Sequence, residues 1–145
     1  MSAIVKHPHD RDSALDVLGT SITILASKET TKNMEVTHQS GEVGMGPPPH
    51  SHAWDESFYV LAGSVSFTCD GNSHLCEKGT LVYVPAGTVH SFQYGEGGGE
   101  MLEFTGQGSN AAQMFTNVSQ EVPPGPPDFE HVTNVLNRNG VTVHV

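Results

Sequence analysis

The chain has 145 residues, the length of one domain of ordinary size. Hydrophobic residues make up 36% of it and 16 glycines add to the apolar fraction, which excludes an intrinsically disordered chain. Acidic residues outnumber basic ones by 16 to 6, so the net charge at pH 7 is −10. A surface with this charge repels nucleic-acid phosphates and anionic lipid headgroups, and we expect neither as a partner.

The sequence also argues against export and against a membrane span. Residues 1–12 contain no apolar segment of the kind that a secretory signal needs. The longest apolar run, Phe58–Ala62, is far shorter than the roughly 20 residues that cross a bilayer. We therefore expect a cytoplasmic protein.

In chain order, the first predicted elements are an arm and a hairpin. Residues 1–14 are polar and are expected to form an N-terminal arm. Between Leu15 and Ala26, two short apolar runs flank Gly19-Thr20 and predict a hairpin or a bent strand. Residues 28–33 read as a polar turn, and Met34–His38 alternates apolar and polar side chains as a strand does.

Further strands are predicted at Ser57–Thr68, Thr80–Val84 and Glu100–Thr105, the last of them after a flexible Gly97–Gly99. Short strands with turn residues between them at this spacing indicate an all-β sandwich or barrel, which we place at residues 15–122.

The two cysteines, Cys69 and Cys76, flank a turn after the first of these strands. If Asp70-Gly71 is a two-residue hairpin loop, Cys69 faces Asn72 and Cys76 faces Val65, whereas a four-residue loop shifts the pairing. Neither register brings the sulfur atoms together, so both cysteines are expected to be reduced thiols.

The C-terminal residues 123–145 have a different character. Pro123–Pro127 is a stiff linker, and Asp128 stands where the N-cap of a helix belongs. Apolar residues then recur with helical period until Gly140, so one short helix is expected at residues 128–139. It is expected to lie against the outside or one end of the barrel.

The candidate ligands for a metal ion lie in two stretches. His50 and His52 are two residues apart, so on extended backbone both side chains leave from one face, and Glu56 has the same parity. Pro85 and Gly87 turn the chain sharply and let His90 re-enter the interior. Three imidazoles and a carboxylate that converge in a β scaffold can bind a divalent metal ion.

A single histidine in a strand is more often an ordinary surface or core residue, and proline-rich loops collect polar residues without a function. Here, however, nine positions agree with the spacing G-x5-H-x-H-x3-E-x6-G followed by G-x5-P-x-G-x2-H. Both stretches resemble the two characteristic motifs of the cupin superfamily. The resemblance implies a double-stranded β-helix, or jelly-roll barrel, in which His50, His52, Glu56 and His90 bind one metal ion.

The residues around these motifs are similar to the small, single-domain, quercetin-dioxygenase-like cupins over about residues 15–105. One position departs from the pattern, because Tyr94 stands where the second motif usually has an asparagine that is not a ligand. Six histidines lack comparable spacing and are expected to be surface or structural residues: His7, His9, His38, His74, His131 and His144. For His38 the alternative is a place at the pocket mouth, which the strand Met34–His38 could approach. Trp54 is expected to pack the edge of the barrel, with pocket lining as the alternative.

The cofactor expected from these residues is one divalent ion of iron, manganese, nickel, cobalt, copper or zinc, which mixed nitrogen and oxygen ligands all accept. The favoured function is a dioxygenase-like oxidoreductase for a small enolizable or aromatic compound, with Glu56 as the catalytic base. An apolar cavity is expected to raise the basicity of Glu56. The alternatives are a small-molecule-binding cupin without catalysis, and a metal-dependent isomerase, lyase or cyclase, since a fold does not give a function. A homodimer through barrel strands and the N-terminal arm is expected, because a jelly roll leaves edges to cover.

Overall fold

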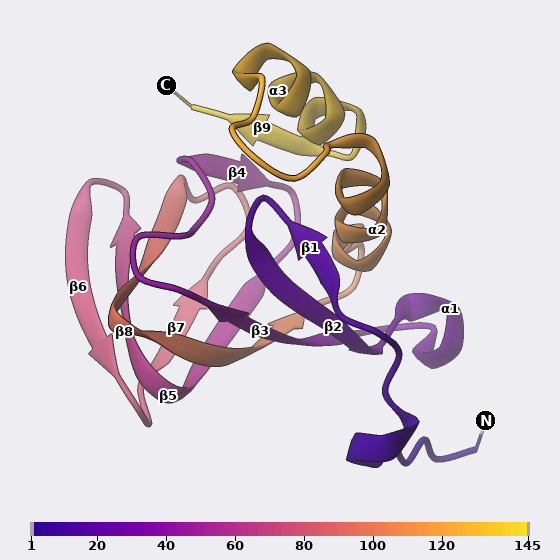
Figure 1. The fold of residues 1–145 in the computed structure, drawn as a ribbon. Coiled ribbons are helices and arrows are strands. Elements are labelled where there is room, and N and C mark those ends of the chain that lie inside the picture. Colours follow the sequence, from indigo (N-terminus) through magenta and orange to yellow (C-terminus); the bar gives the residue numbers. More distant parts are fainter. Residues whose placement is uncertain (1, 145) are drawn as a thin grey trace.

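Nine antiparallel strands form one curled sheet in the structure, a computed structural model that describes residues 2–144 (Figure 1). The strands of this described part are β1 Leu15–Val17, β2 Thr20–Ala26, β3 Glu35–Gly41, β4 His50–His52, β5 Glu56–Cys69, β6 Asn72–Glu77, β7 Leu81–Val84, β8 His90–Thr105 and β9 Val141–Val143. Its helices are the 3-10 turn η1 Pro8–Asp10, the single turn α1 Lys28–Thr31, α2 Ala111–Glu121 and α3 Phe129–Arg138.

The strands curl into a barrel because the two longest ones, β5 and β8, bend together. They pair from Glu56 opposite Thr105 to Cys69 opposite His90, with two shifts of register on either side of Gly63. Gly63 has φ +67°, and a Cβ atom there would lie 2.1 Å from the carbonyl oxygen of Gly98. The close approach is open only to glycine. Strands β6 and β7 extend the sheet from β5, and β3 extends it from β8, which confirms the predicted all-β double-stranded β-helix.

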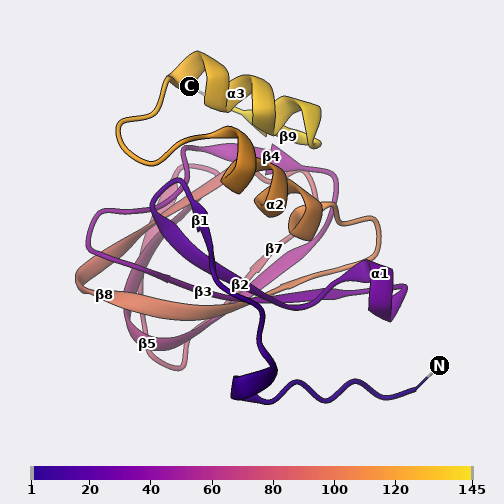
Figure 2. The ribbon, with the colours of Figure 1, turned by 45° about the vertical axis from the view of Figure 1, so that its right-hand side comes forward.

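Two apolar clusters hold the fold together. One fills the barrel between β5 and β8 and contains side chains such as Phe58, Phe67 and Met101. The other joins the end of the barrel to α2 and α3 and includes Trp54 and Val135 (Figures 1 and 2). The helices therefore close one end of the barrel. Because α2 and α3 share this cluster, the division of the chain at residues 122 and 123 stays a prediction.

The C-terminal helix confirms the sequence prediction, while α2 was not predicted. Asp128 caps α3 by accepting hydrogen bonds from the backbone N–H groups of Glu130 and His131. Helix α2 buries an apolar stripe from Ala111 to Val118, a helical pattern that the sequence does contain. The predicted polar turn at residues 28–33 holds the single helical turn α1.

The hairpins follow from their turn residues. The β1–β2 hairpin is confirmed, although its loop is Leu18-Gly19 rather than Gly19-Thr20. Cys69 faces Asn72 and Cys76 faces Val65, as a two-residue loop requires, and both cysteines are free thiols.

The strand predicted at Glu100–Thr105 is the end of the much longer β8. Gly97–Gly99, expected to be a flexible spacer, lies inside it, and Gly99 pairs with both Gly41 and Gly63. In the part of the chain that the structure describes, no helix is long and apolar enough to cross a membrane.

Candidate metal centre

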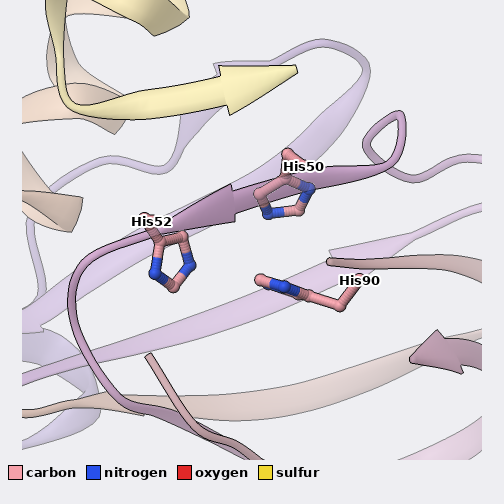
Figure 3. A group of neighbouring side chains, drawn as sticks. All are labelled: His50, His52 and His90. Carbon is pink, nitrogen blue, oxygen red and sulfur yellow. The ribbon is translucent and has the colours of Figure 1, made fainter. Parts of the chain in front are cut away.

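Three of the four predicted ligands meet at the end of the barrel that the helices cover. His50 and His52 lie on one face of β4, and His90 begins β8 directly opposite His50 in the register. Figure 3 shows the three rings turned toward one another. One ligand atom from each ring lies within 4.8 Å of the other two, which is close enough for a single ion. The arrangement is therefore a candidate metal site with three imidazole ligands.

Backbone carbonyls orient all three rings. Each ring directs Nδ1 at a carbonyl oxygen two residues away: His50 at Pro48 (2.8 Å), His52 at Trp54 (3.0 Å) and His90 at Thr88 (2.8 Å). A carbonyl can only accept, so Nδ1 donates in each ring, and Nε2 is the nitrogen that remains to bind an ion once it has lost any proton. Metal-ligating histidines usually have such a partner on the second ring nitrogen. The donor set thus fits a divalent ion.

Glu56 lies beside this group and contacts two of its members. Its Oε1 atom is 2.9 Å from Nε2 of His90 and 3.6 Å from Nε2 of His52. Both ring nitrogens of His90 therefore face an acceptor. Burial alone would lower the pKa of His90, but the Glu56 carboxylate and the Thr88 carbonyl raise it above its usual value. At His50, burial dominates and lowers the pKa to about 4, so this ring stays neutral.

A second carboxyl group, Glu103, was not predicted to belong to the site. It is buried on β8, accepts a hydrogen bond from Thr37 Oγ1 at 3.0 Å, and hydrogen-bonds Glu56. Burial and the neighbouring Glu56 charge raise the pKa of Glu103 well above its usual value, which favours its protonated form, the form that donates to Glu56. The sequence contains one hint of this role. Glu103 is two residues after the apolar Met101, so in a strand both side chains lie on the same face, and Met101 is buried.

The ionisation of Glu56 differs from the expectation. Burial would raise its pKa, as the sequence argument assumed, but hydrogen bonds from His52, His90 and Glu103 outweigh burial and hold the pKa well below its usual value. Glu56 is therefore ionised, which is the form that binds a metal ion and accepts a proton, and it is a weaker base than expected.

An apolar cavity of about 70 Å³ adjoins the site. His50, His52 and Glu56 line it on the barrel side, and apolar side chains of the hairpin and of α2 line it elsewhere. Trp54 serves both predicted roles, since it is buried in the cluster under the helices and also lines the cavity. Its ring stacks on His52, with ring centres 4.3 Å apart. Its indole N–H, also buried, has no hydrogen-bond partner among the described residues.

The remaining candidates lie outside the site. His38 points away from the cavity and pairs with Glu100 on the neighbouring strand, Nε2 to Oε1 3.0 Å. Tyr94, at the position of the usual asparagine, is buried in the barrel core, where its ring packs edge-to-face on Phe92. A Cβ atom at Gly41 would lie 2.4 Å from the Tyr94 ring, so a glycine on the adjacent strand makes room for it.

The affinity of the site for metal is expected to depend on pH. A proton on His90 Nε2 and a metal ion compete for the same lone pair. Because the pKa of His90 is raised, the affinity should already fall at a pH above the usual histidine range and should level off at higher pH. Titration calorimetry with Mn²⁺ in buffers of different ionisation enthalpy would measure the affinity and the protons released. Equal affinity on both sides of neutral pH, with no proton release, would contradict this prediction.

Comparisons with known proteins agree with this fold. Residues 36–104 match the family model described as a cupin domain. Quercetin 2,3-dioxygenase of Bacillus subtilis (strain 168) is 30% identical over 96 residues, which are 65% of this chain and 28% of that enzyme. An RmlC-like cupin from Shewanella frigidimarina superposes with a TM-score of 0.67 at 15% identity, covering 77% of this chain and 96% of that one.

Bacillus subtilis oxalate decarboxylase, described with its Mn(II) centers, superposes with a TM-score of 0.59 at 25% identity, covering 74% of this chain and 31% of that one. The chain thus spans 28% of the length of the dioxygenase and 31% of the length of the decarboxylase.

Proposed function

Because this chain carries a cupin domain at residues 36–104, we propose that it is a metal-dependent, dioxygenase-like oxidoreductase acting on a small enolizable or aromatic compound. The observation that carries the proposal is the convergence of three imidazoles whose Nδ1 atoms are all engaged with carbonyls. The likeness to a quercetin 2,3-dioxygenase supports the oxygen-dependent reaction.

The proposed ligands are the Nε2 atoms of His50, His52 and His90 together with the Glu56 carboxylate. Imidazole and carboxylate ligands accept iron, manganese, nickel, cobalt, copper or zinc, and the likeness to a protein with Mn(II) centers supports manganese among them. A divalent ion bound there would act as a Lewis acid on a substrate oxygen.

The protein's own side chains perform the remaining tasks. Glu56 is ionised and buried beside the histidines, so it can take a proton from an enol, phenol or activated C–H group next to it. Glu103 donates a hydrogen bond to Glu56 and holds its carboxylate in place. The apolar walls keep bulk water away from the reacting groups, which strengthens every charge interaction among them.

Oxygen uptake is the experiment that tests the function. The protein, reconstituted separately with each of the six metals, is assayed against catechols, flavonols and β-dicarbonyl compounds. At least one metal form is expected to consume oxygen with one of these classes. Turnover that persists without oxygen would instead support an isomerase, lyase or cyclase. Binding without turnover in every metal form would support a non-catalytic binding protein.

A homodimer is part of the same proposal. The outer face of β5 and β7 exposes three large neighbouring side chains, Tyr59, Leu81 and Tyr83, at 41%, 64% and 57% of their surface. The arm at residues 2–14 is exposed throughout and packs on nothing in its own chain that would bury it. Both features suit contact with a second copy.

Light scattering at micromolar concentration is expected to give the mass of a dimer, and Leu81→Asp is expected to shift it toward the monomer, because the new charge would be buried in the contact. A wild-type protein that scatters as a monomer would contradict the prediction.

A further inference from the structure

A groove of about 900 Å³ lies next to the cavity at the metal centre. Three connecting segments form its rim, namely the tip of the β1–β2 hairpin, the loop of residues 44–49, and the connection of residues 122–127 between α2 and α3. Its floor is formed by β5 and β8, with the polar side chains Ser66, Thr68, Ser91 and Gln93 beside Phe92. Figures 1 and 2 show the course of these segments. The groove and the cavity share one wall, whose members line both: Leu18, Gly46, Pro47, Pro48 and Phe92.

The sizes of the two spaces indicate how a ligand could occupy them. The cavity of about 70 Å³ is roughly half of the 150 Å³ apolar cavity that takes up one benzene molecule. It can therefore hold only the oxygen-bearing edge of an aromatic compound. The groove, in contrast, has the size of a complete small-molecule site. The body of such a compound would have to lie in the groove, beyond the shared wall.

The chemistry of the groove selects an uncharged, apolar body. Seven of the chain's nine prolines line it, and proline offers no backbone N–H donor and has a fixed φ, so these walls are rigid and mostly apolar. Among the described residues that line the groove, none is Lys or Arg and the one charged side chain is Asp16. An anionic body would meet no positive partner there and would be repelled by a chain of net charge −10.

The shared wall is built from fixed parts. A Cβ atom at Gly46 would lie 1.8 Å from the carbonyl oxygen of Phe92, so the loop is seated directly on β8. Backbone hydrogen bonds of 2.8 and 2.9 Å join Gly44 and Met45 to Tyr94. The Met45 side chain in turn packs over Gly19, where a Cβ atom would lie 2.0 Å from Met45 Cε. The hairpin tip and the loop thus hold each other in position.

Leu18 in this wall has an unusual backbone. Its φ is +54°, a left-handed conformation that two-residue hairpin loops normally assign to Asn, Asp or Gly. The second hairpin loop of this chain follows that rule, with Asp70 at φ +47° in the equivalent position. At residue 18 the chain instead has an apolar side chain, which lines both the groove and the cavity. The strained backbone of Leu18 therefore lies at the junction of the groove and the cavity, which we call the neck.

We propose that the groove binds the uncharged aromatic body of the substrate, while the oxygen-bearing edge passes Leu18 into the cavity beside the histidines. Leu18 is then a specificity-determining residue. The buried indole N–H of Trp54, which lines the cavity and has no partner among the described residues, is available to an oxygen atom of that edge. The assignment of the edge to the cavity rests on the proposed function, whereas the binding of the body in the groove does not.

Three phenols of increasing size and charge test this proposal by calorimetry on the purified protein: phenol, 4-phenylphenol and 4-(4-hydroxyphenyl)benzoate. The uncharged second ring is expected to raise affinity by about tenfold over phenol, since it buries apolar surface in the groove. The carboxylate analogue is expected to bind no more tightly than phenol. The exposed Phe129, which lines the groove at the start of α3, tests the location: Phe129→Ala should reduce the affinity for 4-phenylphenol severalfold and leave that for phenol unchanged.

Leu18→Asn tests the neck with a residue that the turn prefers. Asparagine tolerates this backbone but loses the packing of Leu18 against the cluster under the helices, and because these effects oppose each other the thermal midpoint is expected to change little. The preference for 4-phenylphenol over phenol is expected to fall severalfold. The matched control is Leu75→Asn on exposed β6, which lines neither space and should change neither quantity. A thermal midpoint that drops with Leu18→Asn but not with Leu75→Asn, at unchanged preference, would give Leu18 a purely structural role and overturn its assignment.

The same titrations separate this inference from the proposed function. The preference for the second ring should persist in the His50→Ala/His52→Ala variant, whether or not that variant binds metal. Equal affinities of the wild-type protein for 4-phenylphenol and phenol would overturn the groove assignment. So would a preference for 4-phenylphenol that Phe129→Ala does not reduce. Neither result would bear on the metal centre.

Discussion

Replacement of both His50 and His52 by alanine is expected to remove metal from the purified protein almost completely. Two of the three converging Nε2 atoms disappear, and one imidazole with one carboxylate is too small a donor set to hold a divalent ion in the barrel. Loss of an outer partner of a metal ligand already costs about 10–100-fold in affinity, so the loss of two direct ligands should cost more. Elemental analysis after dialysis against a weak chelator would measure the metal content per chain of the variant and of the wild-type protein.

The chain supplies a matched control for this experiment. His7 and His9 have the same spacing as His50 and His52 and stack on each other, but they are exposed in the N-terminal arm and belong to no buried site. The His7→Ala/His9→Ala variant should retain the metal content of the wild-type protein. Full metal content in the His50→Ala/His52→Ala variant, with both variants folded by circular dichroism, would falsify the ligand assignment.

Glu56→Gln is expected to separate metal binding from turnover. The amide keeps the shape of the side chain and an oxygen that can still approach the ion, so much of the metal should remain. It cannot accept a proton, however, and general base catalysis contributes about 10²–10⁴-fold to a rate. Oxygen uptake by the metal-loaded variant, with the substrate that the wild-type protein turns over, should fall by about that factor.

Glu100→Gln is the matched control for this change. Glu100 lies on the same strand as Glu103 but is partly exposed and pairs with His38 on the outside of the barrel. Its neutralisation should leave both metal content and oxygen uptake unchanged. If Glu56→Gln retained the full rate, Glu56 would not be the base, and another group would have to accept the proton.

Local rules predicted the parts of the site that depend on neighbours in the sequence. The shared face of His50 and His52 follows from the period of two along a strand, and the start of α3 follows from the cap at Asp128. The two-residue loop at Asp70-Gly71 fixed the register that keeps the cysteines apart. In these cases the information lies within a few residues of the feature.

Parts that depend on distant pairing could not be predicted in the same way. The contact of Glu103 with Glu56 exists because β8 lies beside β5 with Phe58 opposite Glu103, and no local pattern encodes that register. The orientation of the His38 side chain has the same origin, because only the pairing of β3 with β8 decides which face of β3 lies inside the barrel. The low pKa of Glu56 arises from three hydrogen-bond donors on two other strands, β4 and β8, which a sequence argument based on burial alone left out.

The short strand β4 has a consequence for the order of events during synthesis. It carries His50 and His52, yet it pairs with β8 at one position only, and its main partner is β9, through Val141, Thr142 and Val143. The ribosome must therefore add 89 residues after His52 before Val141, the residue of β9 that pairs with it, has been synthesised. We therefore expect binding of the proposed metal ion to follow completion of the barrel and both helices, so that nascent chains do not compete with finished protein for the ion.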